Sequence, residues 1–281
     1  MPTFDTPEPI SATIGLSVGD LRIVAGHGGS TIVDIRPTDA SNAEDVKAAE
    51  QTRVEYSSGA LLVKSPKLRS WSLRGGGPSV DVTIELPAGS SVNGSLSSVD
   101  CHCEGPLGDC RIKTGLGGIW VEQAMTVNLK TGLGDITVER ATGDAELTTG
   151  SGEVRARLLD RGAVIKNSNG DTWVGAVSGE LRINAANGSI AVDLAEANVV
   201  AKSANGDVRL GEVVRGSVVL ETAIGDLEVG VREGTAAWLD VSARGGKVHS
   251  SLEASDAPEP SAETVEVRGR TSVGTITIRR P

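Results

Sequence analysis

A repeat of about 18 residues constrains the fold of this chain more than any other feature of its sequence. Each copy has a glycine, then a small or acidic residue, then an apolar–any–apolar triplet. The glycines of seven consecutive copies are 17, 18, 18, 18, 18 and 19 residues apart. The copies are Gly117-Gly118-Ile119-Trp120-Val121, Gly134-Asp135-Ile136-Thr137-Val138, Gly152-Glu153-Val154-Arg155-Ala156, Gly170-Asp171-Thr172-Trp173-Val174, Gly188-Ser189-Ile190-Ala191-Val192, Gly206-Asp207-Val208-Arg209-Leu210 and Gly225-Asp226-Leu227-Glu228-Val229. Such a period indicates structural units stacked one on the next.

A second strand precedes each of these glycines by about nine residues, as in Ala145-Glu146-Leu147 and Leu181-Arg182-Ile183. Alternating apolar and polar residues predict half-buried strands, and the Gly-, Asn- and Ser-rich segments between them predict turns. Two short strands and two turns per repeat describe one coil of a β-solenoid. We therefore predict an all-β fold: a single-stranded-type β-solenoid (β-helix) of about 18-residue coils with an N-terminal β-rich cap containing one short helix.

Stacking of the coils predicts columns of inward side chains. They are Cys110, Val127, Ala145, Ala163, Leu181, Val199 and Val218; Ile112, Leu129, Leu147, Ile165, Ile183 and Leu220; and Ile119, Ile136, Val154, Ile190, Val208 and Leu227. Small and aliphatic residues suit a narrow interior, which explains why aromatic residues make up only 2% of the chain.

Residues 1–90 lack the period and are predicted to form the cap, with the solenoid at 91–281. A helix is expected from Ser41 to Thr52, with Ser41 or Asp39 as its N-cap and an apolar stripe of Val46, Ala49 and Val54. A loop is expected at 254–262, followed by a closing strand at 264–281 that ends in two arginines and a proline, residues that discourage further pairing.

Three segments carry a family resemblance: Arg53-Val54-Glu55-Tyr56, Glu85-Leu86-Pro87-Ala88-Gly89-Ser90 and Gly105-Pro106-Leu107-Gly108-Asp109-Cys110-Arg111-Ile112-Lys113-Thr114-Gly115-Leu116-Gly117. With the Gly-Asp-apolar units that follow, they resemble a bacterial putative-adhesin or β-strand-repeat family, a domain of unknown function. The resemblance covers nearly the whole chain and implies a β-solenoid with an adhesin-like binding role. It brings no catalytic motif.

Charge and hydropathy narrow the classes of partner. With 27 Lys+Arg against 37 Asp+Glu, the net charge is 27 − 37 = −10, which argues against nucleic acid, whose phosphates need a basic surface. No apolar run approaches the ~18 residues that span a bilayer, so direct membrane insertion is not expected. The first ten residues do not read as a signal peptide. We expect a cytoplasmic protein, and association with a surface through a partner remains open.

The residues that could bind a metal or act in catalysis each have a structural explanation. Cys101 and Cys103 share a strand face and His102 points the opposite way, so buried thiols in a reducing compartment are favoured over a zinc site. Asp135, Glu153, Asp171, Asp207 and Asp226 form an acidic column, but each follows a turn glycine, so the repeat indicates a structural role. Calcium-binding repeats space their aspartates differently. No metal, cofactor or catalytic residue is predicted.

Three outward-facing sets are candidate contact surfaces. A lysine column is either a stripe for an acidic partner or a solvated face. Two tryptophans at one repeat position suit carbohydrate or protein contacts, or pack under the N-terminal segment. Three valines form a possible apolar strip. The residues are Lys113, Lys130, Lys166 and Lys202; Trp120 and Trp173; and Val164, Val200 and Val219.

The function favoured by the sequence is a non-catalytic interaction or scaffold protein, an adhesin-like binding module for a protein or glycan, present as a monomer or low oligomer. The alternative is a self-assembling, cytoskeleton-like β-helix. A lesser alternative is a polysaccharide-active enzyme, because some solenoid enzymes place carboxylates in a groove on one face.

Overall fold

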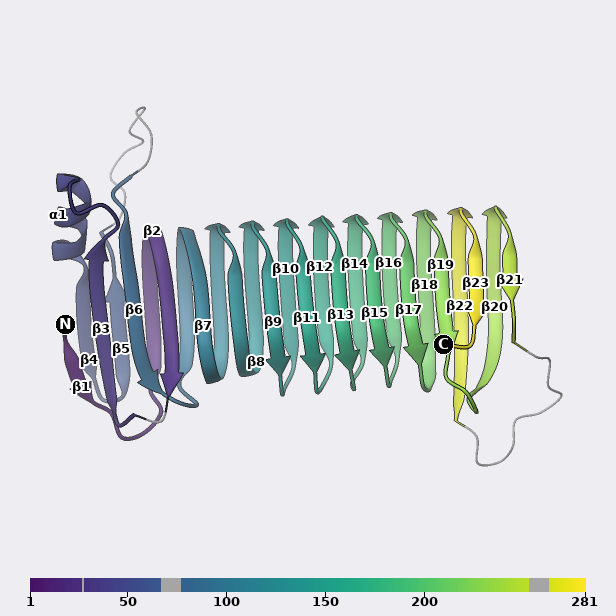
Figure 1. The fold of residues 1–281 in the computed structure, drawn as a ribbon, viewed down its shortest axis with the longest axis horizontal. Helices are drawn as coiled ribbons and strands as arrows, with labels where there is room; N and C mark the ends of the chain where they lie inside the picture. The colour runs from purple at the N-terminus through teal and green to yellow at the C-terminus, as the bar shows by residue number, and fades with distance from the viewer. Residues whose placement is uncertain (27, 67–76, 253–262) are drawn as a thin grey trace. The chain divides into compact units, whose positions relative to one another are not determined.

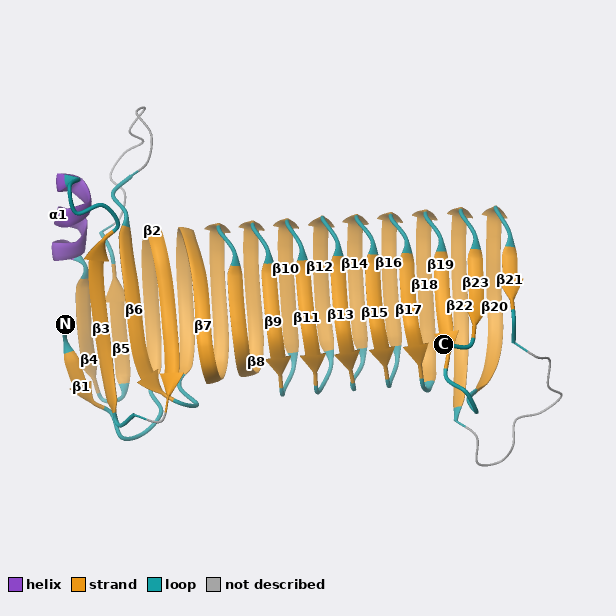
Figure 2. Ribbon diagram, viewed as in Figure 1, coloured by secondary structure: helices purple, strands orange, loops and turns teal. Residues whose placement is uncertain are grey.

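The computed structural model describes residues 1–26, 28–66, 77–252 and 263–281 (Figure 1). Its elements fall into two compact units, Met1–Thr142 and Gly143–Pro281. Apart from one helix, the regular structure of the described residues is β-strand (Figure 2). The loop expected at 254–262 lies outside the described residues.

The first unit holds strands β1 to β9 and the helix α1. They are β1 Thr3–Asp5, β2 Ser11–Gly26, β3 Ser30–Pro37, α1 Ala43–Gln51, β4 Arg53–Ser57, β5 Ala60–Lys64, β6 Val80–Pro87, β7 Ser91–Leu116, β8 Ile119–Leu133 and β9 Ile136–Ala141. Antiparallel pairs β1–β3, β3–β6 and β4–β5 give the expected β-rich N-terminal region.

The helix begins later than predicted. Its N-cap is Asn42, whose side-chain oxygen accepts a hydrogen bond from the Glu44 backbone N–H at 3.0 Å. The predicted caps were wrong because Asp39 instead accepts hydrogen bonds from the backbone N–H and hydroxyl of Ser41, closing a turn ahead of the helix. The predicted stripe was also shifted, since Asp45 and Ala48 are the buried helix residues. Asp45 accepts from the backbone of Asp39 and Ser79, which ties the helix to the strand region.

Parallel stacking already includes β2, within the segment predicted to be aperiodic. Its residues run in register with β7, from Ser11 opposite Ser91 to Val24 opposite Glu104. The other edge of β2 pairs with β5 and then with β6. β7 continues into a pairing with β8, and β8 pairs with β9. The N-terminal region therefore contributes a full-length coil strand to the stack in this unit.

The second unit is a regular β-solenoid. Its strands are β10 Ala145–Ser151, β11 Val154–Leu159, β12 Ala163–Asn169, β13 Thr172–Val177, β14 Leu181–Asn187, β15 Ile190–Ala195, β16 Val199–Asn205, β17 Val208–Val213, β18 Gly216–Ile224, β19 Leu227–Val231, β20 Ala236–Gly245, β21 Val248–Ser250, β22 Thr264–Val273 and β23 Ile276–Arg279. Strands one coil apart pair in parallel, with Ala145 opposite Ala163, Ala163 opposite Leu181 and Leu181 opposite Val199.

All the predicted inward columns are confirmed, because every side chain in them is at most 4% exposed. Each coil alone has a core too thin to be stable, and stacking removes these aliphatic side chains from water at about 25 cal/mol per Å² of apolar surface. The repeat thus fixes both the register of the strands and the composition of the core.

The turn glycines explain why the repeat cannot vary at that position. Gly206 has a φ of 151°, and a Cβ there would lie 2.0 Å from the carbonyl oxygen of Gly188, one coil earlier. Gly188 stands in the same relation to Gly170, with a 2.1 Å approach. Only a residue without a Cβ permits both this backbone conformation and this close stacking.

Chain order and spatial order differ at the C-terminal coils. β18 pairs with β22, and β22 pairs on its other edge with β20. Likewise β19 pairs with β23, which pairs with β21. The strand expected to close the array is therefore next to last in space, and the coil made by β20 and β21 lies beyond it.

Candidate functional site

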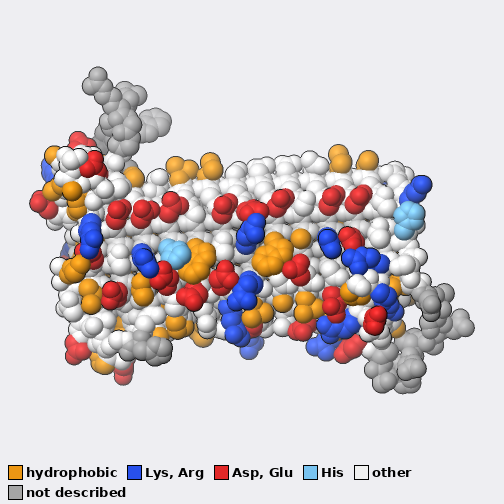
Figure 3. All heavy atoms as spheres, viewed as in Figure 1, with side chains coloured by type: hydrophobic (Ala, Val, Ile, Leu, Met, Phe, Trp, Pro, Cys, Tyr) orange, Lys and Arg blue, Asp and Glu red, His pale blue; other side chains and the backbone are white. Residues whose placement is uncertain are grey.

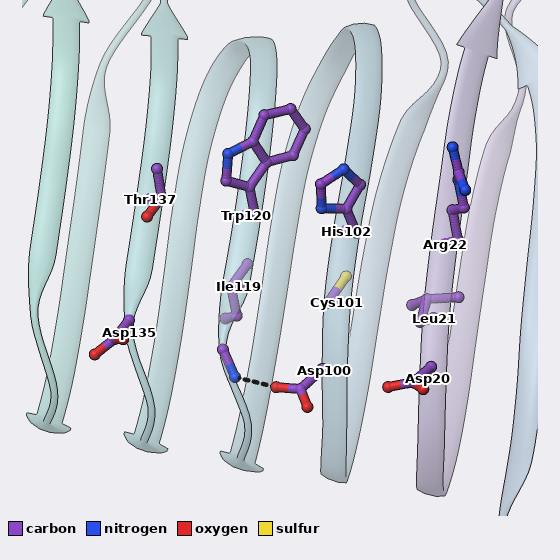
Figure 4. A pocket seen from close by; sticks show the side chains of 11 residues that line it. Asp20, Leu21, Arg22, Asp100, Cys101, His102, Ile119, Trp120, Asp135 and Thr137 are labelled. Carbon is purple, nitrogen blue, oxygen red and sulfur yellow. Dashed lines mark hydrogen bonds between the residues drawn. The ribbon is translucent and has the colours of Figure 1, made fainter.

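An open groove of about 340 Å³ lies on the outer face of the first unit, where β2, β7, β8 and β9 run side by side. Two rows of outward side chains line it. One row is Arg22, His102, Trp120 and Thr137, and the other is Asp20, Asp100, Gly118 and Asp135 (Figure 4). Between the rows, Leu21, Cys101, Ile119 and Ile136 point into the core, as alternation along a strand requires.

An aromatic stack occupies the middle of the first row. The rings of His102 and Trp120 are nearly parallel, with an interplanar angle of 6° and centroids 4.0 Å apart. Their strands are neighbours in register, which sets this contact. Glu104 orients the imidazole, since one of its oxygens lies 3.1 Å from His102 Nε2 and 2.8 Å from a guanidinium nitrogen of Arg22. The basic side chains of this row therefore already share a carboxylate.

The second row carries closely spaced negative charge. Asp100 Oδ1 accepts a hydrogen bond from the Gly118 backbone N–H at 2.6 Å. Partial burial, followed by repulsion from Asp81 and from Asp100, raises the pKa of Asp20 above its usual range. Figure 3 shows acidic side chains near a histidine and a hydrophobic side chain on the face drawn. The groove thus combines an aromatic surface with an acidic edge.

Gly118 has no side chain and leaves space for the groove. Asp135 holds the same position one coil later, and Asp100 one coil earlier. The backbone of Gly118 does not have a positive φ, and a Cβ there would meet its nearest neighbours at an ordinary 3.6 Å. A side chain is therefore sterically tolerated at this position. Its absence leaves open space in the groove between Asp100 and Asp135.

In the second unit, the equivalent acidic residues form structural hydrogen bonds. Asp171 accepts from the Ser189 backbone N–H and Asp207 from that of Asp226, both at 2.8 Å. Asp226 accepts from Thr275 at 2.7 Å. Each carboxylate thus holds a turn of the next coil, which confirms the structural interpretation for these residues. Glu153 forms an ion pair with Arg155 at 2.9 Å.

The predicted contact residues are divided between the two units. Trp120, Lys113 and Lys130 belong to the first unit, where the two lysines are register neighbours. The remaining six belong to the second unit. There Lys166 lies 3.8 Å from Glu146 and Lys202 lies 2.8 Å from Glu221, so acidic partners interrupt the basic column.

The valines and the second tryptophan of that unit lie on different strands. Arg182 separates Val164 from Val200 in register, while Val200 and Val219 are adjacent, so the apolar strip is broken. Trp173 projects from β13, and its indole N–H donates to Asp193 at 3.2 Å. Trp173 is half-buried. Of the two tryptophans, Trp120 alone lines the groove.

The three cysteines are buried and free, as predicted. The sulfurs of Cys101 and Cys103 are 3.8 Å apart. A hydrogen bond with Cys101, together with burial, raises the pKa of Cys103, and a hydrogen bond with Cys103 raises that of Cys110. Cys103 and Cys110 are therefore poor nucleophiles. Within the described ranges, no group of three or more His, Cys, Asp or Glu side chains is placed to hold a metal ion.

Sequence reasoning missed four residues of the groove, namely Asp20, Arg22, Asp100 and His102. A signal for the first pair was present, because Gly19-Asp20-Leu21-Arg22-Ile23 is a copy of the repeat unit. Gly19 has the positive φ of the other turn glycines, 130°. No comparable signal marks Asp100 and His102, whose coil lacks the glycine.

These coils define the protein as a β-solenoid, and comparison with known families agrees. The chain belongs to the Toastrack DUF4097 family, to which residues 22–280 match. A search of curated proteins finds no match. In the part of the chain that the structure describes, no helix is long and apolar enough to cross a membrane.

Solved structures similar to this chain include three described in adhesion terms. A putative cell adhesion protein from Clostridium sporogenes is 13% identical, with a TM-score of 0.29, and the match covers 98% of this chain and 96% of that one. A putative adhesin from Bacteroides fragilis is 12% identical, with a TM-score of 0.34 and coverage of 99% and 95%. A putative adhesin from Parabacteroides distasonis is 12% identical, with a TM-score of 0.31 and coverage of 100% and 95%.

Proposed function

We propose that this chain is a non-catalytic binding module that holds a protein or glycan partner against the groove of its first unit. The observation that supports the proposal most strongly is the aromatic stack of His102 on Trp120 beside the residue, Gly118, at which the acidic column is interrupted. Ser189 also lacks a carboxylate at this position in the second unit, so the aromatic stack is the feature that sets the groove apart. Open, shaped surfaces with an exposed aromatic are typical of contact sites.

The chemistry of the groove favours binding over catalysis. Its carboxylates lie on a shallow surface, and the pKa values of the buried thiols of Cys103 and Cys110 are raised. A nucleophile needs a lowered pKa or an adjacent base, and neither describes these cysteines. Three free, buried thiols also suit a reducing compartment, so we place the module in the cytoplasm, where a partner could recruit it to a membrane.

Recovery of partners with matched variants tests this function. Trp120→Ala removes the aromatic surface of the groove, while Trp173→Ala removes a tryptophan from the equivalent repeat position in the second unit. Both variants and the native chain would be used to capture proteins and glycans from the native cell, after circular dichroism confirms their folding. We expect a defined partner that is lost with Trp120→Ala and retained with Trp173→Ala. Recovery of the same set by all three chains would contradict the proposal.

Self-assembly remains a second candidate because of the coil formed by β20 and β21. Among the described residues, no strand pairs with the outer edge of either one, and Trp238 and Val248 are 59% and 44% exposed. Unpaired strand edges are templates for pairing with another chain. Light scattering over a wide concentration range separates the candidates: a constant mass of one or two chains supports the binding module, and a mass that rises with concentration supports end-to-end assembly.

A further inference from the structure

We propose that the groove of the first unit binds an arginine side chain presented by a protein partner, with the guanidinium against the Trp120 ring on the side of Thr137 and its charge balanced by the acidic row of Asp20, Asp100 and Asp135. This inference rests on the proposed binding function and names the chemistry of the partner. It requires a face of the ring that a ligand can reach, negative charge nearby, and room for a planar cation. The residues around Trp120 meet each requirement.

The indole of Trp120 has one covered face and one less crowded side. His102 stacks on the first at 4.0 Å. On the opposite side the next coil presents Thr137, whose side chain is short, and Trp120 as a whole is half-buried, as Trp173 is. A guanidinium is planar, weakly hydrated and attracted to the face of an indole, so it suits such a position better than an ammonium does.

The acidic row supplies the charge that a guanidinium needs. Asp100 uses Oδ1 to accept from Gly118, and among the described residues no donor contacts its second oxygen. Asp20 neighbours Asp100 in register, and Asp135 lines the same row. Partial burial raises the pKa of Asp20, and repulsion from Asp81 and Asp100 adds to that rise, so negative charges lie close together at this edge. Binding of a cation would relieve that repulsion.

The basic side chains of the groove do not satisfy this acidic row. Arg22 and His102 both contact Glu104, which lies two residues beyond His102 on β7. Both side chains are therefore directed along the first row and away from the Asp20–Asp100 edge. The absence of a side chain at Gly118 leaves the space between Trp120 and the carboxylates where a planar group fits.

Titration with short peptides tests the inference on the full chain. The probe is acetyl-Gly-Arg-Gly-amide, and the matched control carries citrulline, which has the shape of arginine without its charge. Binding would be followed by the indole N–H signals of ¹⁵N-labelled protein. The signal missing from the spectrum of Trp120→Leu identifies that of Trp120. We expect the arginine peptide to shift this signal saturably, with weaker binding at high salt, and the citrulline peptide to leave it unchanged.

Three variants test which residues of the groove contribute to peptide binding. Asp100→Asn keeps an oxygen for the Gly118 N–H but removes one charge from the acidic row, so we expect it to weaken peptide binding by about fivefold, because a nearby charge attracts the guanidinium without a direct contact. Asp207→Asn makes the same change at the same turn position of the second unit and should leave binding unaltered. Gly118→Leu fills the groove without meeting backbone at a forbidden distance and should abolish binding.

Three results with the peptides and the variants would overturn the inference. They are equal binding of the citrulline peptide, no movement of the Trp120 signal at saturating arginine peptide, and equal loss of affinity in Asp100→Asn and Asp207→Asn. Binding of a neutral glycan at Trp120 in place of the peptide would also overturn it. That last outcome would leave the proposed binding function intact, whereas failure of the capture experiment removes the function itself.

Discussion

The carboxylate of Asp207 accepts a hydrogen bond from the backbone N–H of Asp226, its counterpart one coil further along, at 2.8 Å. Asp226 repeats the contact with Thr275. From Asp207 to Thr275, the acidic column of the second unit is therefore a chain of hydrogen bonds between successive turns, and each bond satisfies a backbone donor. The same bond joins Asp171 to Ser189 in the second unit and Asp100 to Gly118 in the first, and in both cases the residue that donates it carries no carboxylate to continue the chain.

Removing one of these bonds should destabilise the second unit modestly. Asp207→Ala leaves the N–H of Asp226 to water, and we expect a loss of about 0.5–1.5 kcal/mol in the free energy of unfolding. Asp207→Asn retains an acceptor oxygen and should lose less. Urea denaturation measures both. Equal losses in the two variants would show that charge, and not the hydrogen bond, stabilises the turn.

The turn glycines should be far less tolerant than their exposure suggests. Gly206→Ala places a Cβ 2.0 Å from a carbonyl oxygen of the preceding coil. We expect it to cost more than ~3 kcal/mol, because the strain of a positive φ adds to the clash. Gly234→Ala is the matched control, since Gly234 also has a positive φ, 80°, but has open space around it. The control should cost about 1 kcal/mol. Similar thermal stability of the two variants would contradict the stacking geometry.

A buried charge should unfold the middle coils. Ile183 is fully buried, and Ile183→Asp places a carboxylate in an aliphatic core with no partner, at a cost of several kcal/mol. The adjacent residue Asn184 faces outward and is exposed, so Asn184→Asp should change stability little. Circular dichroism during thermal unfolding distinguishes the two. Retention of the native melting temperature by Ile183→Asp would show that the inward assignment is wrong.

The ionisation of Asp20 should affect how the free energy of unfolding depends on pH. Because its pKa is higher in the folded chain than in the unfolded chain, its ionisation costs stability as the pH rises through the folded pKa. Asp20→Asn should therefore be more stable than the native chain at about pH 7, by at most ~1 kcal/mol for so exposed a group, and equally stable below about pH 3.

Asp240 provides a control of opposite sign for this measurement. A hydrogen bond with Arg270 lowers the pKa of Asp240, so its contribution is present at neutral pH and is lost as the pH falls through the folded pKa. Asp240→Asn should accordingly be less stable than the native chain at neutral pH. The same sign of change for the two variants would refute the electrostatic account of the Asp20 edge.

Much of the fold could be predicted because the repeat carries it. The inward columns from Cys110 to Leu227 follow from a period that sets both register and burial. The helix cap could not be fixed in the same way, since Asp39, Ser41 and Asn42 are all good capping residues and tertiary contacts of Asp45 decide among them.

The groove was harder to predict, because it depends on pairing between residues far apart in sequence. Asp20 lies beside Asp100 only because β2 stacks on β7, and the cap strands that separate them contain no repeat. The single copy of the repeat at Gly19 was too isolated to be recognised. Spatial order at the C-terminal coils was also hidden, since a local pattern does not reveal that β22 lies between β18 and β20.

Site-specific photo-crosslinking tests the central claim, that the groove of the first unit is a contact site, most directly. A benzoylphenylalanine would replace Thr137 in the groove and, as the control, Ala191, the register neighbour of Trp173 in the second unit. Irradiation of the native cell should give an adduct of discrete mass from position 137 and none from position 191. No adduct from position 137, or the same adduct from both positions, would contradict the account.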